Sequence, residues 1–339
     1  MKRLLILTIV LLLTAGLAVS AVAKDQYEIV MVVKLEGVAW FDNMRLGIQA
    51  FDKEFADVKA YQIGADTADP AAQVALIEDL IAKGVDAILV VPNDPESLVP
   101  VFQKANKAGI LTFTHEASNQ KQVSYDIEAF DNIAYGRHMM DVMAEYIGKE
   151  GKWQPFVGHL TSTTHNEWVD GEEMQVKEKY PKIVRATDRI EEKENQQIAY
   201  EKSLELLKTY PDLKAIMGSA MSTVPGAAQA IEEKGLIGKV GAFGTCLPSV
   251  AGDYLESGAA KSIHFWVPAD AGYVSAMVAY KTLKGEEIKD GTNLGRPGYE
   301  SIIIKKNKDG VPVIYGQAWM DVTKENLKEW KKPDGDYKL

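Results

Sequence analysis

The chain has 339 residues, 46% of them hydrophobic, and carries 48 acidic against 38 basic side chains. Single hydrophobic cores stop growing at about 250–300 residues, so this length predicts two domains. The acidic balance, with no cluster of Lys and Arg, excludes nucleic acid as a partner because phosphate binding depends on such clusters. The single cysteine, Cys246, cannot form an internal disulfide, and we expect it to be a small buried apolar residue.

Residues 1–23 have the pattern of a cleavable export signal. Residues 1–3 (MKR) are basic, residues 4–13 are apolar, and residues 21–23 (AVA) have the small-x-small form of a signal peptidase site. The alternative, a membrane anchor, needs roughly 20 apolar residues, more than this run supplies. No cysteine lies near the expected cut, so we predict an exported protein that is not a lipoprotein.

After this signal, apolar runs of strand length alternate with helical patterns. The runs are rich in Val and Ile and mostly lack polar alternation, as is typical of parallel strands covered on both faces. The first series lies at 27–33, 58–63, 87–91 and 110–114, with helix starts at Asp69-Pro70 and Asp94-Pro95, where a carboxylate caps the helix before a proline.

A second series of the same kind follows. Its strands are expected at 153–160, 183–187, 215–217, 240–244 and 260–266, with helices at 166–180, 196–210, 222–234 and 269–283. We therefore predict an α/β fold of two doubly wound parallel-sheet lobes, with a ligand crevice at the carboxyl ends of the strands. Short strand-like stretches at 124–128 and 301–304 fit neither lobe cleanly.

Four segments of the chain have a recognisable composition: 32–41 (VVKLEGVAWF), 91–94 (VPND), 165–169 (HNEWV) and 224–230 (VPGAAQA). They resemble the type I periplasmic sugar-binding proteins of ABC importers, and most closely the branch of autoinducer-2-binding and rhamnose-binding proteins. The resemblance covers essentially the whole chain after the signal. It implies two lobes joined by three hinge strands, which close on one small polyhydroxylated ligand and present the closed form to a membrane permease.

The resemblance also implies how the lobes divide the chain. We expect hinges near Phe130, Trp266 and Gly298. The N-terminal lobe should then comprise 24–130 plus 267–298, the C-terminal lobe 131–266 plus 299–315, and the tail 316–339 should pack outside both lobes.

A sugar receptor needs aromatic planes for the C–H faces of its ligand and charged or amide groups for the hydroxyls. Both kinds of side chain occur at the predicted strand ends of each lobe. The candidate ligand-binding residues are Lys34, Trp40, Phe41, Asn93, Asp94, His115 and Glu116 in the first lobe and Thr164, His165, Asn166, Glu167, Trp168, Ser219, Met221, Thr245 and Trp266 in the second.

Several of these candidates also have a purely structural interpretation. Lys34 could be a solvated lysine at a strand end, and Asp94 could serve only as a helix cap. Asn166 could cap a helix whose core contains Trp168. The resemblance nevertheless places a ligand-binding lysine at Lys34 and an acidic ligand group at Glu116.

The chain departs from the autoinducer-2 receptors at residues that matter for the ligand. Those receptors have an Asp-Gln pair where this chain has Thr164-His165, a proline near Ser219 and an alanine near Met221. A hydrogen-bonding site rejects a ligand that leaves its buried groups unpaired. We therefore expect a pentose, a deoxyhexose or a small polyol, with autoinducer-2 as the alternative.

Enzyme motifs are missing from the sequence. Residues 115–119 (HEASN) lack the second histidine of a zinc-protease helix, and there is no P-loop, dinucleotide-binding glycine fingerprint or Gly-x-Ser-x-Gly turn. The five histidines have no metal-like spacing, and His165 with Glu167 is the pair expected to converge first if a metal or hydrolytic site exists. A DNA-binding repressor with the same two-lobed core would need a helix-turn-helix where this chain has its signal.

The sequence therefore predicts a receptor that is not an enzyme and needs no cofactor or metal. Its expected partners are a small sugar or polyol and an ABC transporter permease, and we expect it to be a monomer. Whether a chemoreceptor also binds the closed form stays open.

Overall fold

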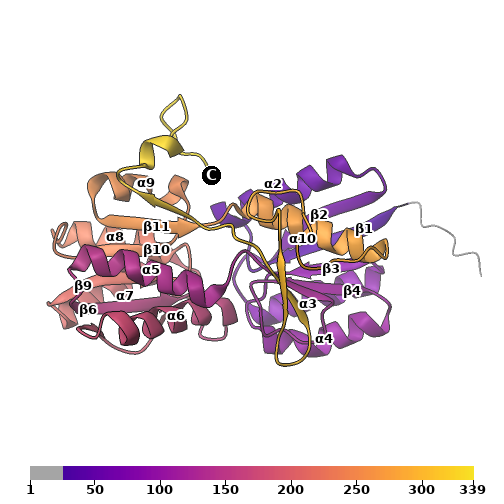
Figure 1. The fold of residues 1–339 in the computed structure, drawn as a ribbon, viewed down its shortest axis with the longest axis horizontal. Helices are drawn as coiled ribbons and strands as arrows, with labels where there is room; N and C mark the ends of the chain where they lie inside the picture. Colours follow the sequence, from indigo (N-terminus) through magenta and orange to yellow (C-terminus); the bar gives the residue numbers. More distant parts are fainter. Residues whose placement is uncertain (1–25) are drawn as a thin grey trace, which may run out of the picture.

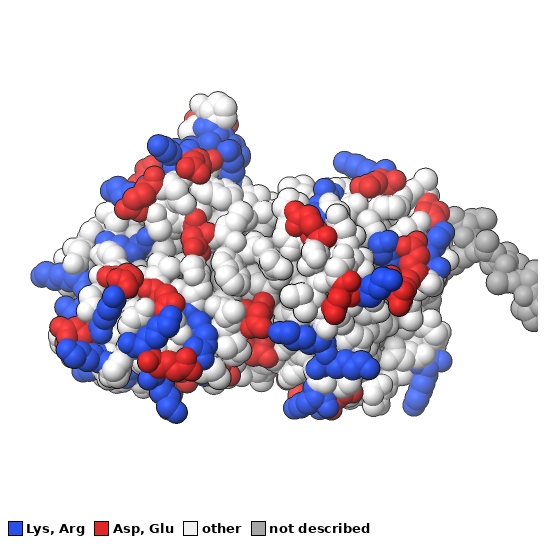
Figure 2. All heavy atoms as spheres, in the orientation of Figure 1, with Lys and Arg blue, Asp and Glu red and all other residues white. Residues whose placement is uncertain are grey.

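The computed structural model describes residues 26–339 and shows two α/β lobes side by side, each built around one sheet (Figure 1). The predicted export signal, residues 1–23, lies outside this range. Within the described range, no helix has the length and apolar character needed to cross a membrane. On the face seen in Figure 2, acidic and basic side chains are interspersed over both lobes.

The first lobe contains a seven-stranded sheet in the order β12-β13-β5-β4-β3-β1-β2, parallel except for β12. Helices α2 and α10 pack together beside it, and α3 packs beside α4 (Figure 1). Its elements are β1 (Tyr27–Val33), α2 (Ala39–Glu54), β2 (Val58–Gly64), α3 (Pro70–Lys83), β3 (Ala87–Val90), α4 (Pro95–Lys107), β4 (Leu111–His115), β5 (Tyr125–Glu128), α10 (Pro268–Leu283), β12 (Ile303–Lys306) and β13 (Pro312–Tyr315).

The second lobe contains strands in the order β14-β11-β10-β9-β6-β7, with β8 paired to β6 and β14 antiparallel to β11. Its elements are α5 (Asn132–Ile147), β6 (Gly151–Val157), α6 (Thr163–Lys179), β7 (Ile183–Arg185), β8 (Ile190–Glu191), α7 (Gln196–Thr209), β9 (Leu213–Gly218), α8 (Thr223–Glu233), β10 (Gly241–Thr245), α9 (Pro248–Ser257), β11 (Ala260–Phe265), β14 (Met320–Thr323) and the 3₁₀ helix η1 (Leu327–Trp330).

The apolar strand runs explain why helices cover both faces of each sheet. In β1, Met31 belongs to the core cluster that includes the buried face of α2, whereas its neighbours Val30 and Val32 belong to the cluster of α3 and α4. Successive side chains of a strand point to opposite faces, so a strand without polar alternation needs cover on both. The predicted fold class of two doubly wound lobes is confirmed.

The chain crosses between the lobes three times, at 129–131, 266–267 and 316–319. One aromatic residue from each crossing contributes to a single cluster, because Phe130 lies 5.2 Å from Trp266 and 5.5 Å from Trp319 between ring centroids. Residues 316–319 therefore make the third crossing, and the chain at Gly298, where the resemblance placed a hinge, does not cross between the lobes. Gly298 instead packs against that crossing, and its carbonyl accepts from the Gln317 N–H at 2.7 Å.

Two parts of the expected domain division are wrong. Residues 299–315 belong to the first lobe, because β13 pairs in parallel with β5, with Val313 opposite Asp126, and thereby covers an edge that would otherwise be unpaired. The tail does not pack outside the lobes, because β14 adds a strand to the second sheet and its Val322 is fully buried. Strands of four residues carry too little periodicity to assign to a lobe from sequence.

Candidate functional site

Strand ends from the two lobes face each other across one cavity. Lys34 directly follows β1 and Glu116 directly follows β4, while Glu194 lies between β8 and α7 and His165 lies in the first turn of α6. The cavity encloses about 140 Å³. A water molecule needs at least about 10–15 Å³ of such space, so the cavity has room for a molecule of roughly ten heavy atoms.

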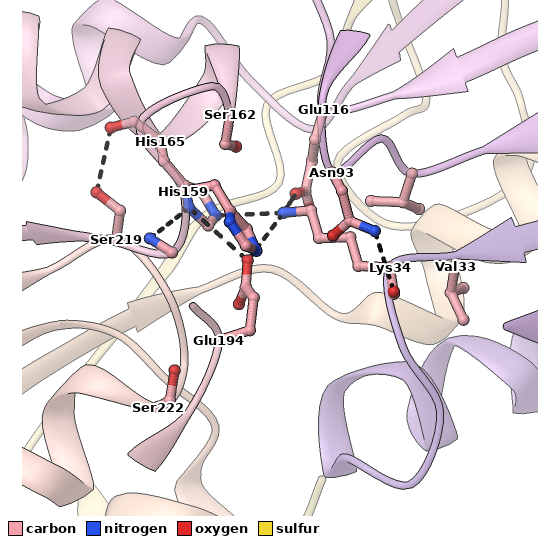
Figure 3. A network of polar contacts seen from close by, with 12 residues as sticks. Val33, Lys34, Asn93, Glu116, His159, Ser162, His165, Glu194, Ser219 and Ser222 are labelled. Carbon is pink, nitrogen blue, oxygen red and sulfur yellow. Dashed lines mark hydrogen bonds and ion pairs between the residues drawn. The ribbon is translucent and has the colours of Figure 1, made fainter. Parts of the chain in front are cut away.

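The ammonium group of Lys34 is the centre of the polar wall (Figure 3). It donates to Glu116 Oε2 at 3.0 Å within its own lobe and to Glu194 Oε1 at 3.4 Å across the gap. Lys34 is only 2% exposed, and Glu116 only 5%. These contacts link the two lobes through one buried positive charge.

Both carboxylates are held by unusual backbone geometry. Glu116 has φ +65° and Glu194 has φ +55°, the left-handed region that side chains larger than glycine rarely adopt. Such strain persists only where the surrounding structure enforces it, and it concentrates at functional sites. The sequence folds so that two strained residues deliver their carboxylates to the same lysine.

The electrostatics keep Lys34 charged. Burial lowers the pKa of Lys34, but the charges of Glu116 and Glu194 and their hydrogen bonds raise it by more, so the pKa lies above its ordinary value. One ammonium and two carboxylates leave this wall with an excess of formal negative charge. Burial, with a further contribution from the charge of Lys34, holds the pKa of His165 well below its ordinary value, so this imidazole is neutral near pH 7.

His165 lies between two hydrogen-bond donors. The Gly158 N–H donates to His165 Nδ1 at 3.2 Å, and the Lys34 ammonium lies 3.4 Å from His165 Nε2. A neutral imidazole accepts at one nitrogen only, so it cannot accept both contacts. When Nδ1 accepts from Gly158, the Nε2–H and the ammonium group are two donors facing the same space. An oxygen atom of a ligand placed there would accept from both.

Aromatic rings form the rest of the wall. Trp266 packs edge-on against Trp40 of the first lobe at 4.6 Å and against Trp168 of the second at 5.8 Å between ring centroids. The buried Trp266 Nε1 has no hydrogen-bond partner among the described residues. Apolar side chains complete the lining: Leu35, Val38, Phe41, Met221, Pro225 and Val250.

Ten of the sixteen candidates named from sequence line this cavity. They are Lys34, Trp40, Phe41, Glu116, His165, Trp168, Ser219, Met221, Thr245 and Trp266. Nine of the ten lie at or near the carboxyl end of a strand or in the first turn of the helix that follows, with Trp266 at the second crossing, and Trp168 lies in the second turn of α6. The rule that ligands bind at the carboxyl ends of parallel strands therefore located most of the wall.

Two of the remaining candidates in the first lobe have structural roles outside the cavity: Asn93 holds the backbone of Lys34, and Asp94 caps a helix. The buried Asn93 donates from Nδ2 to the Lys34 carbonyl at 3.2 Å, and Asp94 caps α4 by accepting from the Glu96 N–H at 3.1 Å. His115 is turned away through a 2.6 Å contact between its Nδ1 and the Ile127 carbonyl.

Three candidates on α6 lie outside the cavity. Thr164 Oγ1 donates to Glu128 of the first lobe at 3.2 Å, and Glu167 Oε1 accepts from Ser118 of the first lobe at 2.6 Å. Asn166 Nδ2 donates to the Ser162 carbonyl at 2.8 Å. Glu167 therefore does not pair with His165, and no metal-ligand group forms from these two within residues 26–339. Thr164 and Glu167 instead connect the two lobes beside the cavity.

Glu194 is the most important lining residue that the sequence analysis missed. It follows a strand of only two residues, which the sequence pattern did not reveal. A usable signal was the capping Asn195 at the start of α7, since residues just before a helix start in these lobes lie at the crevice edge. The other lining residues missed were Leu35, Val38, Gln196, Ala220, Ser222, Pro225 and Val250.

Replacing His165 with Asn should change how stability depends on pH. Because the folded pKa of His165 is depressed, the unfolded chain binds more protons below about pH 6.5, and the wild type loses stability as pH falls through that range. His165→Asn lacks this titration. The difference in unfolding free energy, wild type minus variant, should fall by up to about 1.4 kcal/mol per pH unit below pH 6.5.

Denaturant titrations from pH 8 to pH 5 measure this difference, and the difference should be constant above pH 7.5. The other histidines are present in both proteins, so the difference isolates the titration of His165 together with its electrostatic coupling to His159. Parallel stability curves down to pH 5 would show that His165 takes up a proton in the folded protein as readily as in the unfolded one.

Comparison with known proteins identifies relatives of this architecture. The chain is 28% identical over 239 residues to the D-ribose/D-allose-binding protein of Pseudomonas aeruginosa, covering 67% of this chain and 73% of the relative. It is 28% identical over 322 residues to the xylitol-binding protein of Mycolicibacterium smegmatis, covering 85% and 86%.

The fold is also shared with solved structures. LsrB from Clostridium saccharobutylicum in complex with AI-2 superimposes with a TM-score of 0.82, at 20% sequence identity, over 90% of this chain and 100% of the other. The family model of the periplasmic binding protein domain matches residues 29–287. The family resemblance predicted from the sequence is confirmed, and the chain belongs to the periplasmic binding protein domain family.

Proposed function

We propose that this chain is the solute-binding component of an ABC import system, which captures a small sugar or polyol between its lobes and delivers it to a permease. The observation that carries the proposal is the cavity wall in which Lys34, Glu116 and Glu194 meet beside tryptophans packed edge-on. Family relatives bind, by name, ribose or allose and xylitol. Members of such a family bind their solutes without converting them, so the proposed role is not enzymatic.

The polar wall suits hydroxyl groups. A hydroxyl can accept from Lys34 and His165 and at the same time donate its proton to Glu116 or Glu194. A ligand carboxylate could accept but not donate, and it would add a third negative charge to the wall. Tryptophan rings supply the apolar planes against which the C–H faces of a sugar pack. This combination supports a neutral polyhydroxylated ligand.

Closure of the lobes is the proposed mechanism of capture. Contacts between the lobes beside the cavity join them in this structure, such as Ser118 to Glu167 at 2.6 Å and Thr163 to Asn119 at 2.7 Å, and separating the lobes would break these contacts. A ligand that touches both walls stabilises that form by its differential affinity for it. Micromolar affinity corresponds to about 8 kcal/mol, which a few charge-assisted hydrogen bonds and stacked rings can supply.

Autoinducer-2 remains the second candidate ligand. In its favour, Lys34 and the acidic Glu116 stand where the autoinducer-2 receptors have a lysine and an aspartate. Against it, Thr164 hydrogen-bonds to Glu128 and does not line the cavity, so one charged group of those receptors has no counterpart here.

The first test of this function is isothermal titration calorimetry with pentoses, hexoses, deoxyhexoses, pentitols and autoinducer-2. We expect one-to-one binding of a neutral sugar or polyol and no binding of the corresponding sugar acids. Binding of autoinducer-2 alone would make the chain a signal receptor. If no compound of the panel binds, both the sugar or polyol assignment and the autoinducer-2 assignment are contradicted.

Removing either carboxylate should weaken the ligand found in that panel. Glu116→Gln and Glu194→Gln each keep the shape of the side chain but lose a charged acceptor, so we expect affinity to fall at least tenfold, as for hydrogen bonds to charged groups worth about 1.5–3 kcal/mol. The matched control is Glu96→Gln, whose side chain pairs with Lys121 on the surface. Unchanged affinity in both cavity variants would exclude this wall as the binding site.

We also propose that the chain is exported, cleaved after residue 23 and active as a monomer in the periplasm. The pattern of residues 1–23 and the family support this location. Mass spectrometry of the exported protein should give a chain that begins at Lys24. An exported species that retains residues 1–23 would instead indicate an anchored receptor.

A further inference from the structure

Two histidines and one aspartate converge outside the ligand cavity. His138 lies on α5, His264 on β11 and Asp321 on β14. Their possible ligand atoms all lie within 4.8 Å of one another, and this is the one group of its kind in residues 26–339. Asp321 Oδ2 is 2.7 Å from His138 Nε2, and Asp321 Oδ1 is 2.7 Å from His264 Nδ1. None of the three lines the cavity.

The positions of these residues in the chain are informative. Helix α5 begins just after the first crossing between the lobes, β11 ends just before the second, and β14 begins just after the third. In the second lobe, α5, β11 and β14 are the elements next to the three crossings, and each of them supplies one member of the group. An ion bound by all three residues would link these three elements to one another.

The surroundings resemble those of a built metal site. His264 is fully buried, and its other ring nitrogen, Nε2, lies 3.0 Å from Ser262 Oγ. Metal-binding histidines commonly have such a partner, which fixes the orientation of the ring. The ring of His138 stacks on Trp319 with centroids 5.7 Å apart and planes inclined by 19°.

Access and coordination chemistry indicate the kind of ion. The side chains of His138 and Asp321 are 31% and 36% exposed, so an ion and a water molecule can reach the group. Two imidazole nitrogens and one carboxylate oxygen suit Zn²⁺ and similar transition metals, whereas Ca²⁺ and Mg²⁺ prefer oxygen ligands alone. Three protein ligands leave the fourth tetrahedral position to water.

We propose that His138, His264 and Asp321 bind one divalent transition-metal ion, of which Zn²⁺ is the best match. This ion links α5, β11 and β14 where they adjoin the crossings between the lobes. On binding, the two hydrogen bonds to Asp321 are replaced by metal–ligand bonds. Each histidine nitrogen that donated a hydrogen bond gives up its proton, which passes to the other nitrogen of the same ring or, where that nitrogen already carries one, is released to water. The site lies within one lobe, so the ion stabilises that lobe and leaves closure to the ligand.

The test is calorimetric titration of the purified, tag-free protein with Zn²⁺ after treatment with EDTA and removal of the chelator. We expect one ion per chain, a higher melting temperature at saturation, and no comparable response to Mg²⁺ or Ca²⁺. Asp321→Asn can still hydrogen-bond to both histidines but loses the anionic ligand, and its affinity for Zn²⁺ should fall at least about tenfold.

Two further variants separate a built site from adventitious binding. Ser262→Ala keeps all three ligands but removes the partner of His264 Nε2, so we expect a loss of about tenfold in Zn²⁺ affinity. Asp309→Asn makes the same chemical change as Asp321→Asn in the exposed turn between β12 and β13 and should bind Zn²⁺ like the wild type. Circular dichroism confirms that each variant is folded.

The proposal is overturned if the wild type binds no Zn²⁺, or if Asp321→Asn binds it as tightly as the wild type. In the first case the group is only a hydrogen-bonded network in which Asp321 accepts from both imidazoles. In the second, the ion binds elsewhere on the protein. These results are independent of the sugar titrations, so either proposal can fail without the other.

Discussion

The buried ammonium group of Lys34 constrains the rest of the site. A charge removed from water must be paired, because an unpaired buried ion is strongly destabilising. Here one partner, Glu116, comes from the same lobe and the other, Glu194, from the opposite lobe. The segments that follow β1, β4 and β8 therefore meet at Lys34, and both carboxylates that pair with it stand on left-handed backbone.

A second constraint comes from the aromatic cluster at the hinge. Phe130, Trp266 and Trp319 belong to the three different crossings, and Trp266 also forms part of the cavity wall, where it contacts Trp40. Movement of the crossings therefore also moves Trp266 and changes the cavity wall. Tightly packed interiors favour a few discrete arrangements over continuous deformation, which suits a receptor that alternates between open and closed forms.

Charge and shape together explain the preference we propose for neutral ligands. Lys34 alone would attract anions, but two carboxylates outweigh it, and the neutral His165 adds a donor without adding charge. The aromatic and aliphatic lining then favours the C–H faces of the ligand. A family that binds many sugars with one fold can change its ligand by altering these few side chains, because function resides in the site and the scaffold stays the same.

Sequence alone determined the fold class and most of the cavity wall. Apolar strand runs such as 27–33 and capped helix starts such as Asp69-Pro70 depend on local periodicity and local hydrogen bonds, which a sequence displays directly. Because the carboxyl ends of parallel strands meet at one edge, the residues that follow those runs can be grouped by their position in the chain. Lys34, Glu116 and Thr245 were located in this way.

Tertiary structure decided what depends on pairing between distant segments. It placed β13 beside β5 and β14 beside β11, and so moved 299–315 to the first lobe and the third crossing to 316–319. It also brought Glu194 to Lys34, 160 residues away, and turned Thr164 toward Glu128. Short strands carry little periodicity, and the direction of a polar side chain depends on which partner packing brings within hydrogen-bond distance, so neither could be read from the sequence alone.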